Sequence, residues 1–580
     1  MIRLAPRHAR AAVVLSAAAL AAWSLHGKVH AEDRLKELQT EYSNNAQEKL
    51  DRVYHFGSQG AGDVFSNHRS HSNRQVPIYV WGTKADLGQI TGANSSYRDP
   101  EKLRGIFGFV PENTVNPEAE YGDQSEARKV IESAVAKGAK HIFIVWFDGM
   151  DWVPTQAASI VKNQKVHAEG KGSGLIFQDY AAPGSNPQYG WLVTSPRYDK
   201  ADVNVDEQTV KIPESSLKGG YDVAIAGPNP WTPGPLASQA PGYLKGQSAS
   251  ARDKQGVESA GRELHAYTDS SQSAAEFVSG VKSYNNSVNV DVEGRPVATV
   301  FHALQEKGWR TGTVTNGPFP HASPAGMYAQ NVSRNDYQDL GRTMLGIPAV
   351  INEKRGAPVR PGLDVVMGTG HGVKVENREV KGQGGNWVRG NVYITDADRE
   401  AVDVKNGGKY TVVTTEKGVN GGEAVKKAAA EAAAKGTRLF GFFGDTGMDD
   451  LPYRTANGHY DPAPSPTSSG EKPKAIAYTR EQLDSQPTLA QMTDAALTVL
   501  ARPDEKFILF VEAGDVDHGL HANNLDVAVG AVYAGEDAIK RIIDWVETHS
   551  NWDDSALLVS SDHGHYLVLD HPEGLLNSSK

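Results

Sequence analysis

The sequence predicts an α/β protein built as a three-layer sandwich, in which helices flank a large, mostly parallel central sheet. Two observations lead to this prediction. Helical segments and apolar runs alternate repeatedly from about residue 124 onward. Three of the predicted strands also end at a carboxylate, and ligands bind outside the carboxyl ends of the strands in open sheets of this kind. The 580-residue chain shows no internal sequence repeat, so one large decorated domain is favoured over several small ones.

The alternating units share one pattern, a helical segment followed by a continuous apolar run. Apolar runs of this length without alternation are typical of strands that are buried on both faces. The predicted helices are Ser125–Lys137, Pro296–Lys307, Glu423–Lys435, Pro487–Leu500 and Asp526–Thr548. The strands that follow them are His141–Phe147, Trp309–Thr315, Arg438–Phe443, Phe507–Val511 and Ser555–Ser560.

The first 31 residues resemble an export signal. Three arginines precede the apolar run Ala11–Leu25, and Val29–Ala31 resembles a cleavage site. The run is shorter than the roughly 20 residues of a membrane-spanning helix, so a cleaved signal is favoured over an anchor. We therefore expect an exported protein, periplasmic or secreted, without a stable membrane span after processing. The mature domain would comprise residues 32–580, with a helix over 34–50 and insertions at about 152–262 and 345–422.

The composition excludes several kinds of partner and site. The chain has 59 Lys and Arg against 70 Asp and Glu, and removing residues 1–31 changes the formal net charge from −11 to −15, because four positive charges are lost. Nucleic acid is not expected as the main partner, since phosphate binding needs a basic face. The absence of Cys excludes disulfides, zinc–thiolate sites and cysteine nucleophiles. His, Asp, Glu, Ser and Thr must therefore supply any metal site or nucleophile.

Acidic and histidine residues gather where the predicted strand Phe507–Val511 ends. Glu512 follows the strand, and Asp517 and His521 come shortly after it. Side chains at positions i and i+4 of a helical turn can reach one divalent ion, and zinc accepts both ligand types. A solvated acidic loop is the alternative, but such loops seldom follow a buried strand directly. The segment therefore predicts a metal site.

Two further strands end at similar groups. Asp562 and His563 close the strand Ser555–Ser560, and Asp148 closes the strand His141–Phe147. A lone Asp-His pair is often only a structural hydrogen bond. Because a second cluster of acids and histidines follows a neighbouring strand, a second metal ion is the better interpretation.

Ser270 is a candidate nucleophile. It lies at the predicted start of a helix that runs to about Ser283, where free N–H groups and the helix dipole favour an anion. From this segment alone, an ordinary N-capping serine is the simpler interpretation. Beside two metal ions, the same hydroxyl group would be activated for attack.

Together, these motifs resemble the alkaline phosphatase family, and they occur in the family's order. They are Asp148-Gly-Met150, Thr268-Asp-Ser270, Gly280-Val-Lys-Ser-Tyr-Asn285, His321-Ala-Ser-Pro-Ala325, Glu512 with Asp517 and His521, and Asp562-His563. The resemblance covers about residues 124–570 in patches. It implies the family's three-layer fold and a hydrolase that acts on phosphate monoesters through a phosphoserine, with small phosphorylated molecules as substrates.

The resemblance also implies a role for each matching residue. Ser270 would be the phosphorylated nucleophile, and Arg334 would hold two phosphate oxygens with its fork of donors. Two zinc ions and one magnesium ion would be bound. The ligands would be Asp148, Asp562, His563 and Ser270 for one zinc, Asp517 and His521 for the other, and Asp148, Glu512 and Ser323 for magnesium, with Ser323 where the family usually has Thr. His321 and His518 fall where animal-type members have histidines, which leaves the third metal's identity open.

One zinc ligand is left unassigned by the sequence. In the family, the zinc ion at the Asp517 and His521 positions has a third ligand, a histidine well after the Asp-His pair. After His563 only His565 and His571 are found, so we expect one of these, or a histidine of an insertion, to serve.

Alternative functions remain compatible with the sequence. An incomplete zinc site would favour an exported metal- or phosphate-binding protein with weak activity. A phosphodiesterase of the same superfamily is a second alternative, because the first insertion has room for extra recognition elements. A sulfatase is disfavoured, since Ser270 lacks the expected Pro and Arg neighbours. The physiological substrate and the oligomeric state stay open, and a homodimer is compatible with the sequence.

Overall fold

The central sheet of the computed structural model contains ten strands, in the order β15-β16-β12-β11-β17-β7-β18-β5-β8-β6. All pairings are parallel except those of β5, which runs antiparallel to both of its neighbours. The strands are β5 (Val76–Trp81), β6 (Gly122–Asp123), β7 (His141–Phe147), β8 (Gln188–Val193), β11 (Arg310–Pro318), β12 (Val365–Thr369), β15 (Tyr410–Thr414), β16 (Arg438–Phe442), β17 (Phe507–Ala513) and β18 (Ser555–Ser560). This arrangement confirms the predicted large, mostly parallel sheet.

The structure describes most of the chain, with gaps. The described residues are 33–44, 53–56, 58–59, 65–66, 71–72, 74–185, 187–232, 265–375, 381–445, 448, 450–463, 476–565, 567–569 and 571–577. The predicted export signal over 1–31 lies outside these residues, as does the part of the predicted helix 34–50 beyond residue 44. Within the described residues, no helix combines the length and the apolar character that crossing a membrane requires.

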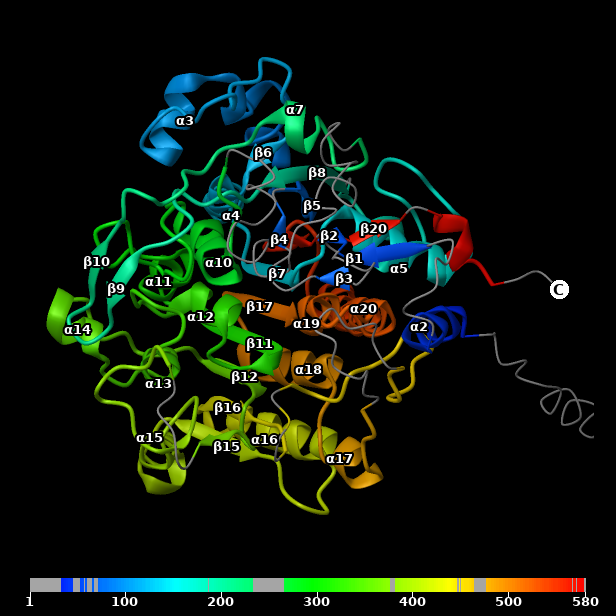
Figure 1. The fold of residues 1–580 in the computed structure, drawn as a ribbon. Coiled ribbons are helices and arrows are strands. Elements are labelled where there is room, and N and C mark those ends of the chain that lie inside the picture. Colours follow the sequence, from blue (N-terminus) through cyan, green and yellow to red (C-terminus); the bar gives the residue numbers. More distant parts are fainter. Residues whose placement is uncertain are drawn as a thin grey trace, which may run out of the picture.

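Helices cover both faces of the sheet (Figure 1). Along β7, Ile142, Ile144 and Trp146 belong to one buried cluster, whereas Phe143 and Val145 belong to another. Because successive side chains of a strand point to opposite faces, each face has its own core. One core packs against α4 (Ala127–Ala136), α10 (Ser270–Ser279), α11 (Val300–Gln305), α12 (Ala322–Tyr328) and α13 (Tyr337–Leu345). The other packs against α5 (Trp152–Asn163), α16 (Gly421–Lys435), α18 (Leu489–Leu500) and α20 (Leu525–His549), which confirms the three-layer sandwich.

Shorter elements surround these layers. The remaining helices are α2 (Arg34–Asn44), α3 (Pro100–Phe107), α6 (Ile176–Asp179), α7 (Val223–Ala226), α14 (Val350–Arg355), α15 (Asp396–Val402), α17 (Arg480–Asp484) and α19 (Asp515–His521). The short strands are β1 (Tyr54–Phe56), β2 (Ser58–Gln59), β3 (Phe65–Ser66), β4 (His71–Ser72), β9 (Asp202–Asn204), β10 (Thr209–Lys211), β13 (Lys374–Val375), β14 (Gly390–Asn391), β19 (Gly564–His565) and β20 (Leu567–Leu569).

Two predicted helices are shorter than the sequence suggested. The helix predicted over Pro296–Lys307 begins only at Val300, because the side chain of Thr299 accepts the N–H of His302 and caps it there. The helix predicted from Ser270 to about Ser283 ends at Ser279. Gly280 follows it with a φ of 75°, and its N–H donates to the carbonyl of Glu276. A glycine in this left-handed conformation ends many helices.

The two predicted insertions both contribute to the central sheet. β8 lies within 152–262, and β12 and β15 lie within 345–422. Neither segment is therefore wholly external to the sheet. β5 lies in a polar stretch for which the sequence predicted no strand, and it pairs with both β18 and β8.

Two small antiparallel pairs join the beginning of the described chain to its end. β1 pairs with β20, with Tyr54 opposite Leu569. β4 pairs with β19, with His71 opposite His565 and Ser72 opposite Gly564. These pairs bring an N-terminal segment to the edge of the sheet where β7, β17 and β18 end.

Candidate active site

Three neighbouring strands of the sheet, β17, β7 and β18, deliver carboxylates to one edge. Asp148 directly follows β7, Glu512 is the next-to-last residue of β17, and Asp562 comes two residues after β18. Since these strands are parallel and adjacent, their carboxyl ends coincide in space. All three side chains are buried, with exposed fractions of 4% or less. The predicted convergence of these acids is confirmed.

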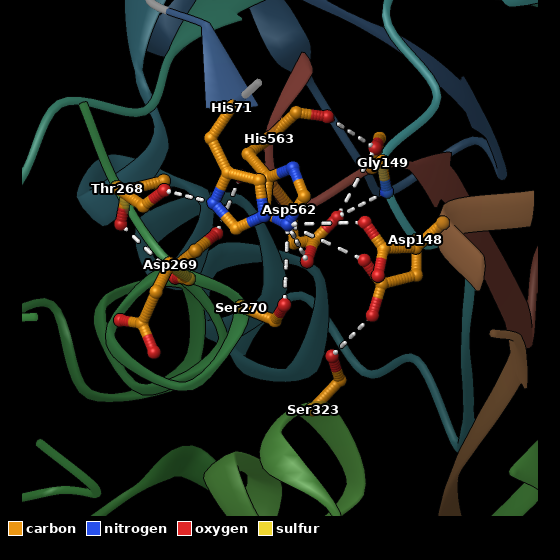
Figure 2. Close-up of polar contacts among 12 residues, drawn as sticks. His71, Asp148, Gly149, Thr268, Asp269, Ser270, Ser323, Asp562 and His563 are labelled. Carbon is orange, nitrogen blue, oxygen red and sulfur yellow. Dashed lines mark hydrogen bonds and ion pairs between the residues drawn. The ribbon is translucent and has the colours of Figure 1, made fainter. Parts of the chain in front are cut away.

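Asp148, Asp562 and His563 form a compact group (Figure 2). Nε2 of His563 lies 3.4 Å from Oδ1 of Asp148 and 3.2 Å from Oδ2 of Asp562. Two ligand atoms of one tetrahedral zinc ion lie about 3.3 Å apart, because Zn–N and Zn–O bonds are about 2.0–2.1 Å long. Oδ1 of Asp148 and Oδ2 of Asp562 are buried and have no hydrogen-bond partner among the described residues. The spacing and the two unpartnered oxygens both fit a zinc ion.

The other oxygen of Asp562 is fixed by the backbone. Oδ1 accepts the N–H of Gly149 over 2.8 Å. Gly149 has a φ of 72°, and a Cβ at this position would lie 2.7 Å from the ring of His565. Only glycine allows this turn to bring its N–H against Asp562. Asp562 is thereby oriented with its free oxygen toward His563.

Ser270 is the first residue of α10, and it does not cap the helix. Asp269 is the capping residue, and its carboxylate accepts the N–H of Gln272. The hydroxyl group of Ser270 is therefore available, and its Oγ lies 3.1 Å from Nε2 of His563 (Figure 2). A buried hydroxyl group stands beside the candidate zinc ligands, at the positive end of a ten-residue helix.

Arg334 approaches the same helix end from the loop that follows α12. Its Nη1 lies 2.8 Å from Oδ2 of Asp269. Burial alone would raise the pKa of Asp269, but the guanidinium of Arg334 and the N–H of Asn286 hold it below its ordinary value. The ion pair places a guanidinium, with its fork of donors, beside the residue that precedes Ser270.

Ser323 and Glu512 stand on the far side of Asp148. Oγ of Ser323 lies 3.4 Å from Oδ2 of Asp148. Thr315 donates to Oε2 of Glu512 over 2.5 Å. Burial raises the pKa of Glu512 to about 7, and it raises that of Asp148 well above its ordinary value, with Asp562 adding to the effect. Such crowding of buried acids is relieved by a bound cation. An all-oxygen set of this kind suits magnesium.

His321 and His518 lie beside this oxygen set, with ring centroids 5.9 Å apart. Nδ1 of His518 donates to Oδ2 of Asp450 over 2.9 Å. Burial would lower the pKa of His518, but the carboxylates of Asp450, Asp517 and Asp515 raise it to about 10. Burial lowers the pKa of His321 to about 3. His518 is thus held in an ion pair, while His321 stays neutral next to Arg334.

Asp517 and His521 lie on α19, and the predicted helical turn is confirmed. Nε2 of His521 is 3.3 Å from Oδ1 of Asp517, which again matches the spacing of two zinc ligands. Burial would raise the pKa of Asp517, but His521 and His565 hold it well below its ordinary value. Burial lowers the pKa of His521 to about 4, so its ring stays neutral and able to bind a metal ion.

Of the two candidates that follow His563, only His565 reaches this group. Its Nε2 lies 2.5 Å from Oδ1 of Asp517. The side chain of His571 is about half exposed and lies 3.4 Å from Glu573. His565 is therefore at the site, whereas His571 pairs on the surface.

One histidine of the site was missed by the sequence analysis. The pairing of β4 with β19 brings His71 to Asp517, His563 and His565, within 4.8 Å in terms of ligand atoms. His71 lies in a polar stretch rich in Ser, Asn and Arg, with no strand pattern. Only the presence of His68 and His71 near each other could have indicated a function there.

Comparisons with known proteins identify a family for the chain. The sequence profile of the alkaline phosphatase family matches residues 247–573, which is more than half of the chain. The chain belongs to the alkaline phosphatase family. The matched region contains Ser270 and every metal ligand predicted from the sequence except Asp148, which directly follows β7.

The curated relatives are alkaline phosphatases of bacteria and of insects. Those of Escherichia fergusonii and Escherichia coli strain K12 are each 27% identical to this chain, over 313 and 316 residues, and both matches cover 53% of this chain. Alkaline phosphatase 4 of Bacillus subtilis is 24% identical over 296 residues and covers 51% of this chain. The chain spans 60% of the length of the two Escherichia proteins and 49% of the Bacillus protein.

Solved structures of alkaline phosphatases also resemble the chain. The Thermus thermophilus enzyme has a TM-score of 0.40 and 20% identity, covering 74% of this chain and 60% of its own. The cold-active enzyme of a Shewanella species has a TM-score of 0.39 and 16% identity, covering 73% of this chain and 68% of its own.

Proposed function

We propose that this protein hydrolyses phosphate monoesters through a phosphoserine at Ser270, within a site that holds two zinc ions and one magnesium ion. The observation that supports this most strongly is the position of Ser270. Its Oγ lies 3.1 Å from Nε2 of His563, within the group formed by His563, Asp148 and Asp562. A buried serine at a helix start, facing unpartnered carboxylate oxygens, is the arrangement that a metal-activated nucleophile needs.

The ions have distinct ligand sets. Asp148, Asp562 and His563 would hold one zinc next to Ser270, and Asp517 and His521 would hold the other. Asp148, Glu512 and Ser323 would hold magnesium. When bound, the zinc ions supply positive charge that favours the deprotonated hydroxyl group and stabilises the leaving oxygen.

The reaction proceeds in two displacements. Oγ of Ser270 bonds to phosphorus as the ester P–O bond breaks and the alcohol leaves. A water molecule then breaks the bond between Oγ and phosphorus, which releases inorganic phosphate and restores the serine. Asp269 keeps Ser270 at the first position of α10 by capping the helix, so that both steps occur at one place.

The chain also supplies fixed charge for the phosphoryl group. Negative charge spreads over the three outer phosphate oxygens during transfer. The N–H groups at the start of α10 lie at the end of the helix that bears Ser270. The guanidinium of Arg334 lies at the same end, because it pairs with the capping residue Asp269. Because they are already in place before the reaction, they need little reorganisation to stabilise the transition state.

Replacement of the nucleophile tests this proposal. The full chain, supplied with zinc and magnesium, is assayed with p-nitrophenyl phosphate as wild type and as Ser270→Ala. We expect turnover to fall by several orders of magnitude, on the scale seen when a catalytic nucleophile is removed. Ser279→Ala, at the other end of α10, is the matched control and keeps its activity. Unchanged monoester hydrolysis in Ser270→Ala refutes the nucleophile assignment.

A second comparison separates the monoesterase from a phosphodiesterase. Bis-p-nitrophenyl phosphate carries a second ester group where a monoester has a third charged oxygen. The positive groups around Ser270 favour the more charged monoester. We expect faster hydrolysis of the monoester, and preference for the diester contradicts the proposed substrate class.

We propose the same setting for the protein that the sequence predicted, namely export with cleavage after Ala31. N-terminal sequencing of the protein recovered from outside the cytoplasm tests this. A mature chain that begins at Glu32 supports export, whereas an intact Met1 in that fraction contradicts cleavage.

A further inference from the structure

We infer that His71, from the N-terminal segment, is the third protein ligand of the zinc ion held by Asp517 and His521. This inference rests on the proposed metal site and specifies it further. It assigns a ligand far before the catalytic strands in the sequence, where neither the motifs nor the family match at residues 247–573 indicates one.

The distances carry the inference. Nε2 of His71 lies 3.4 Å from Nε2 of His521, and Nε2 of His521 lies 3.3 Å from Oδ1 of Asp517. Both values match the separation of about 3.3 Å between ligand atoms of a tetrahedral zinc ion. His71 also belongs, with Asp517, His563 and His565, to a group whose ligand atoms all lie within 4.8 Å of one another, so its ring lies within that distance of Asp517.

His565 does not fit the same ion. Its Nε2 is 2.5 Å from Oδ1 of Asp517, which is much shorter than the distance between two ligands of one metal ion. A separation of that size is a hydrogen bond between imidazole and carboxylate. His565 therefore orients Asp517, as groups around a metal site usually do for a ligand.

The second ring nitrogen of His71 is engaged in the way that zinc-binding histidines require. Its Nδ1 lies 2.9 Å from the carbonyl oxygen of Thr268 (Figure 2). A carbonyl oxygen can only accept, so Nδ1 carries the proton and Nε2 presents a lone pair. Metal-binding histidines commonly donate their other N–H to a carbonyl or carboxylate in this way. The contact also ties His71 to the segment that bears Ser270.

Contacts of His71 itself and of the nearby Arg74 hold this segment in place. β4 pairs with β19, so His71 lies opposite His565. The His71 ring stacks on that of His563, with centroids 3.7 Å apart. Arg74 donates to the carbonyl oxygen of Leu567 over 2.5 Å and lies 3.7 Å from Asp151. A ring held this firmly needs little further ordering to bind zinc.

Zinc binding to the full chain tests the inference. The metal-free protein is titrated with zinc in competition with a chromophoric chelator, as wild type, His71→Ala and His571→Ala. We expect two tight sites in wild type and in the His571→Ala control. In His71→Ala, one of the two sites weakens by at least about 100-fold, since losses of 10–100-fold follow even the removal of outer partners of metal ligands.

Added imidazole guards against a folding defect. It can occupy the space of the missing ring, so it restores the second zinc site of a folded His71→Ala variant but not of a misfolded one. Two tight sites in folded His71→Ala overturn the inference, as does a loss of zinc from the folded variant that imidazole does not reverse.

Activity is measured separately on the same samples. If wild type binds two zinc ions with the His71 dependence but does not hydrolyse monoesters, the proposed function fails and the assignment of His71 stands. If wild type binds no zinc, both fail.

Discussion

Oδ2 of Asp269, the residue before Ser270, lies 2.8 Å from Nη1 of Arg334. Asp269 thus does two things at once, since it also caps α10 by accepting the N–H of Gln272. The ion pair fixes the direction of the guanidinium, and little of either side chain is exposed to water, 14% for Arg334 and 12% for Asp269. The orientation of the arginine is therefore set by the same residue that sets the position of the nucleophile.

The Arg334 side chain is expected to bind phosphate. Arg334→Ala should raise the KM for p-nitrophenyl phosphate and the inhibition constant of inorganic phosphate by about 10- to 100-fold, as a lost charged hydrogen bond of about 1.5–3 kcal/mol would do. The KM and the inhibition constant of Arg334→Lys should lie between those of wild type and Arg334→Ala, because an ammonium group lacks the paired donors of a guanidinium. Steady-state kinetics check both. The exposed Arg295 gives the control variant Arg295→Ala, and unchanged phosphate inhibition in Arg334→Ala contradicts the role.

Ser323 is expected to support the magnesium site through its hydroxyl group. Ser323→Ala removes a hydroxyl 3.4 Å from Asp148 and should reduce or abolish activation by magnesium. Ser323→Thr keeps the hydroxyl and should retain activation, although its extra methyl group enters a fully buried position and costs about 1–3 kcal/mol of stability. Activity against magnesium concentration, measured with zinc fixed, checks the difference. Equal magnesium responses in the Ala and Thr variants would speak against this site.

Removal of metals should destabilise the fold. The buried acids at the strand ends repel one another without cations, and an ion present at 100 times its Kd adds about 2.7 kcal/mol to stability. We expect a chelator to lower the Tm, and zinc with magnesium to restore it. Asp148→Asn should show a smaller metal-dependent shift, whereas Asp484→Asn on the surface should behave like wild type. Thermal scans provide the measurement. A Tm that is the same with and without metals would contradict the prediction.

His302 should make stability fall in mild acid. Burial lowers its pKa from 6.5 in the unfolded chain to about 3, and its Nε2 lies 2.8 Å from the carbonyl oxygen of Tyr328. Between these pH values the unfolded chain binds a proton that the folded chain does not. The stabilisation is thus complete above pH 6.5 and is lost as the pH falls, by about 1.4 kcal/mol per pH unit.

The variant His302→Gln removes this titration. It should be less stable than wild type near neutral pH, and the gap in Tm between them should narrow at pH 5. The exposed His549 supplies the control His549→Gln, for which the gap should not change. A constant gap between wild type and His302→Gln across this range would show that His302 does not titrate as described.

Lys282 should be essential for stability although it lies outside the reacting groups. It is fully buried, 3.2 Å from Asp123 and 3.0 Å from Glu276. Lys282→Met leaves two buried acids without a cation and should cost about 3–5 kcal/mol. Adding Glu276→Gln should recover part of the loss, because burial already raises the pKa of Glu276 to about 8. Thermal unfolding checks this, with Lys540→Met on the surface expected to change little; a mild effect of Lys282→Met would contradict the prediction.

Much of the site could be predicted because its groups follow strong local patterns. Asp148, Glu512 and Asp562 each come at the end of a buried strand, and adjacent parallel strands place such residues together. Asp517 and His521 share a helical turn, which their spacing already indicated. The sandwich was predictable for the same reason, since long apolar runs of the type His141–Phe147 identify strands that are covered on both sides.

Other parts of the structure depend on contacts that leave no local pattern. β4 comprises only two residues, so it has no periodicity by which the sequence could reveal it. Its partner lies almost five hundred residues further on, and the pairing alone brings His71 to the site. The sequence analysis missed β5 because Pro77 and the polar residues before and after the strand obscure its pattern. Its pairing with β18 and β8 stabilises it in the sheet.

The join between β4 and β19 has a consequence for the order of events during synthesis. His71 is made early, whereas His563 and His565 are made almost five hundred residues later. Closing so large a loop is entropically costly, and neither this contact nor the pairing of β5 with β18 can form before the C-terminal partner strand has been made. Under the assignment of His71, the second zinc ion depends on a contact between two segments made at very different times. A chain that stops before β19 lacks the strand that pairs with β4, so we expect it to bind the second zinc ion weakly.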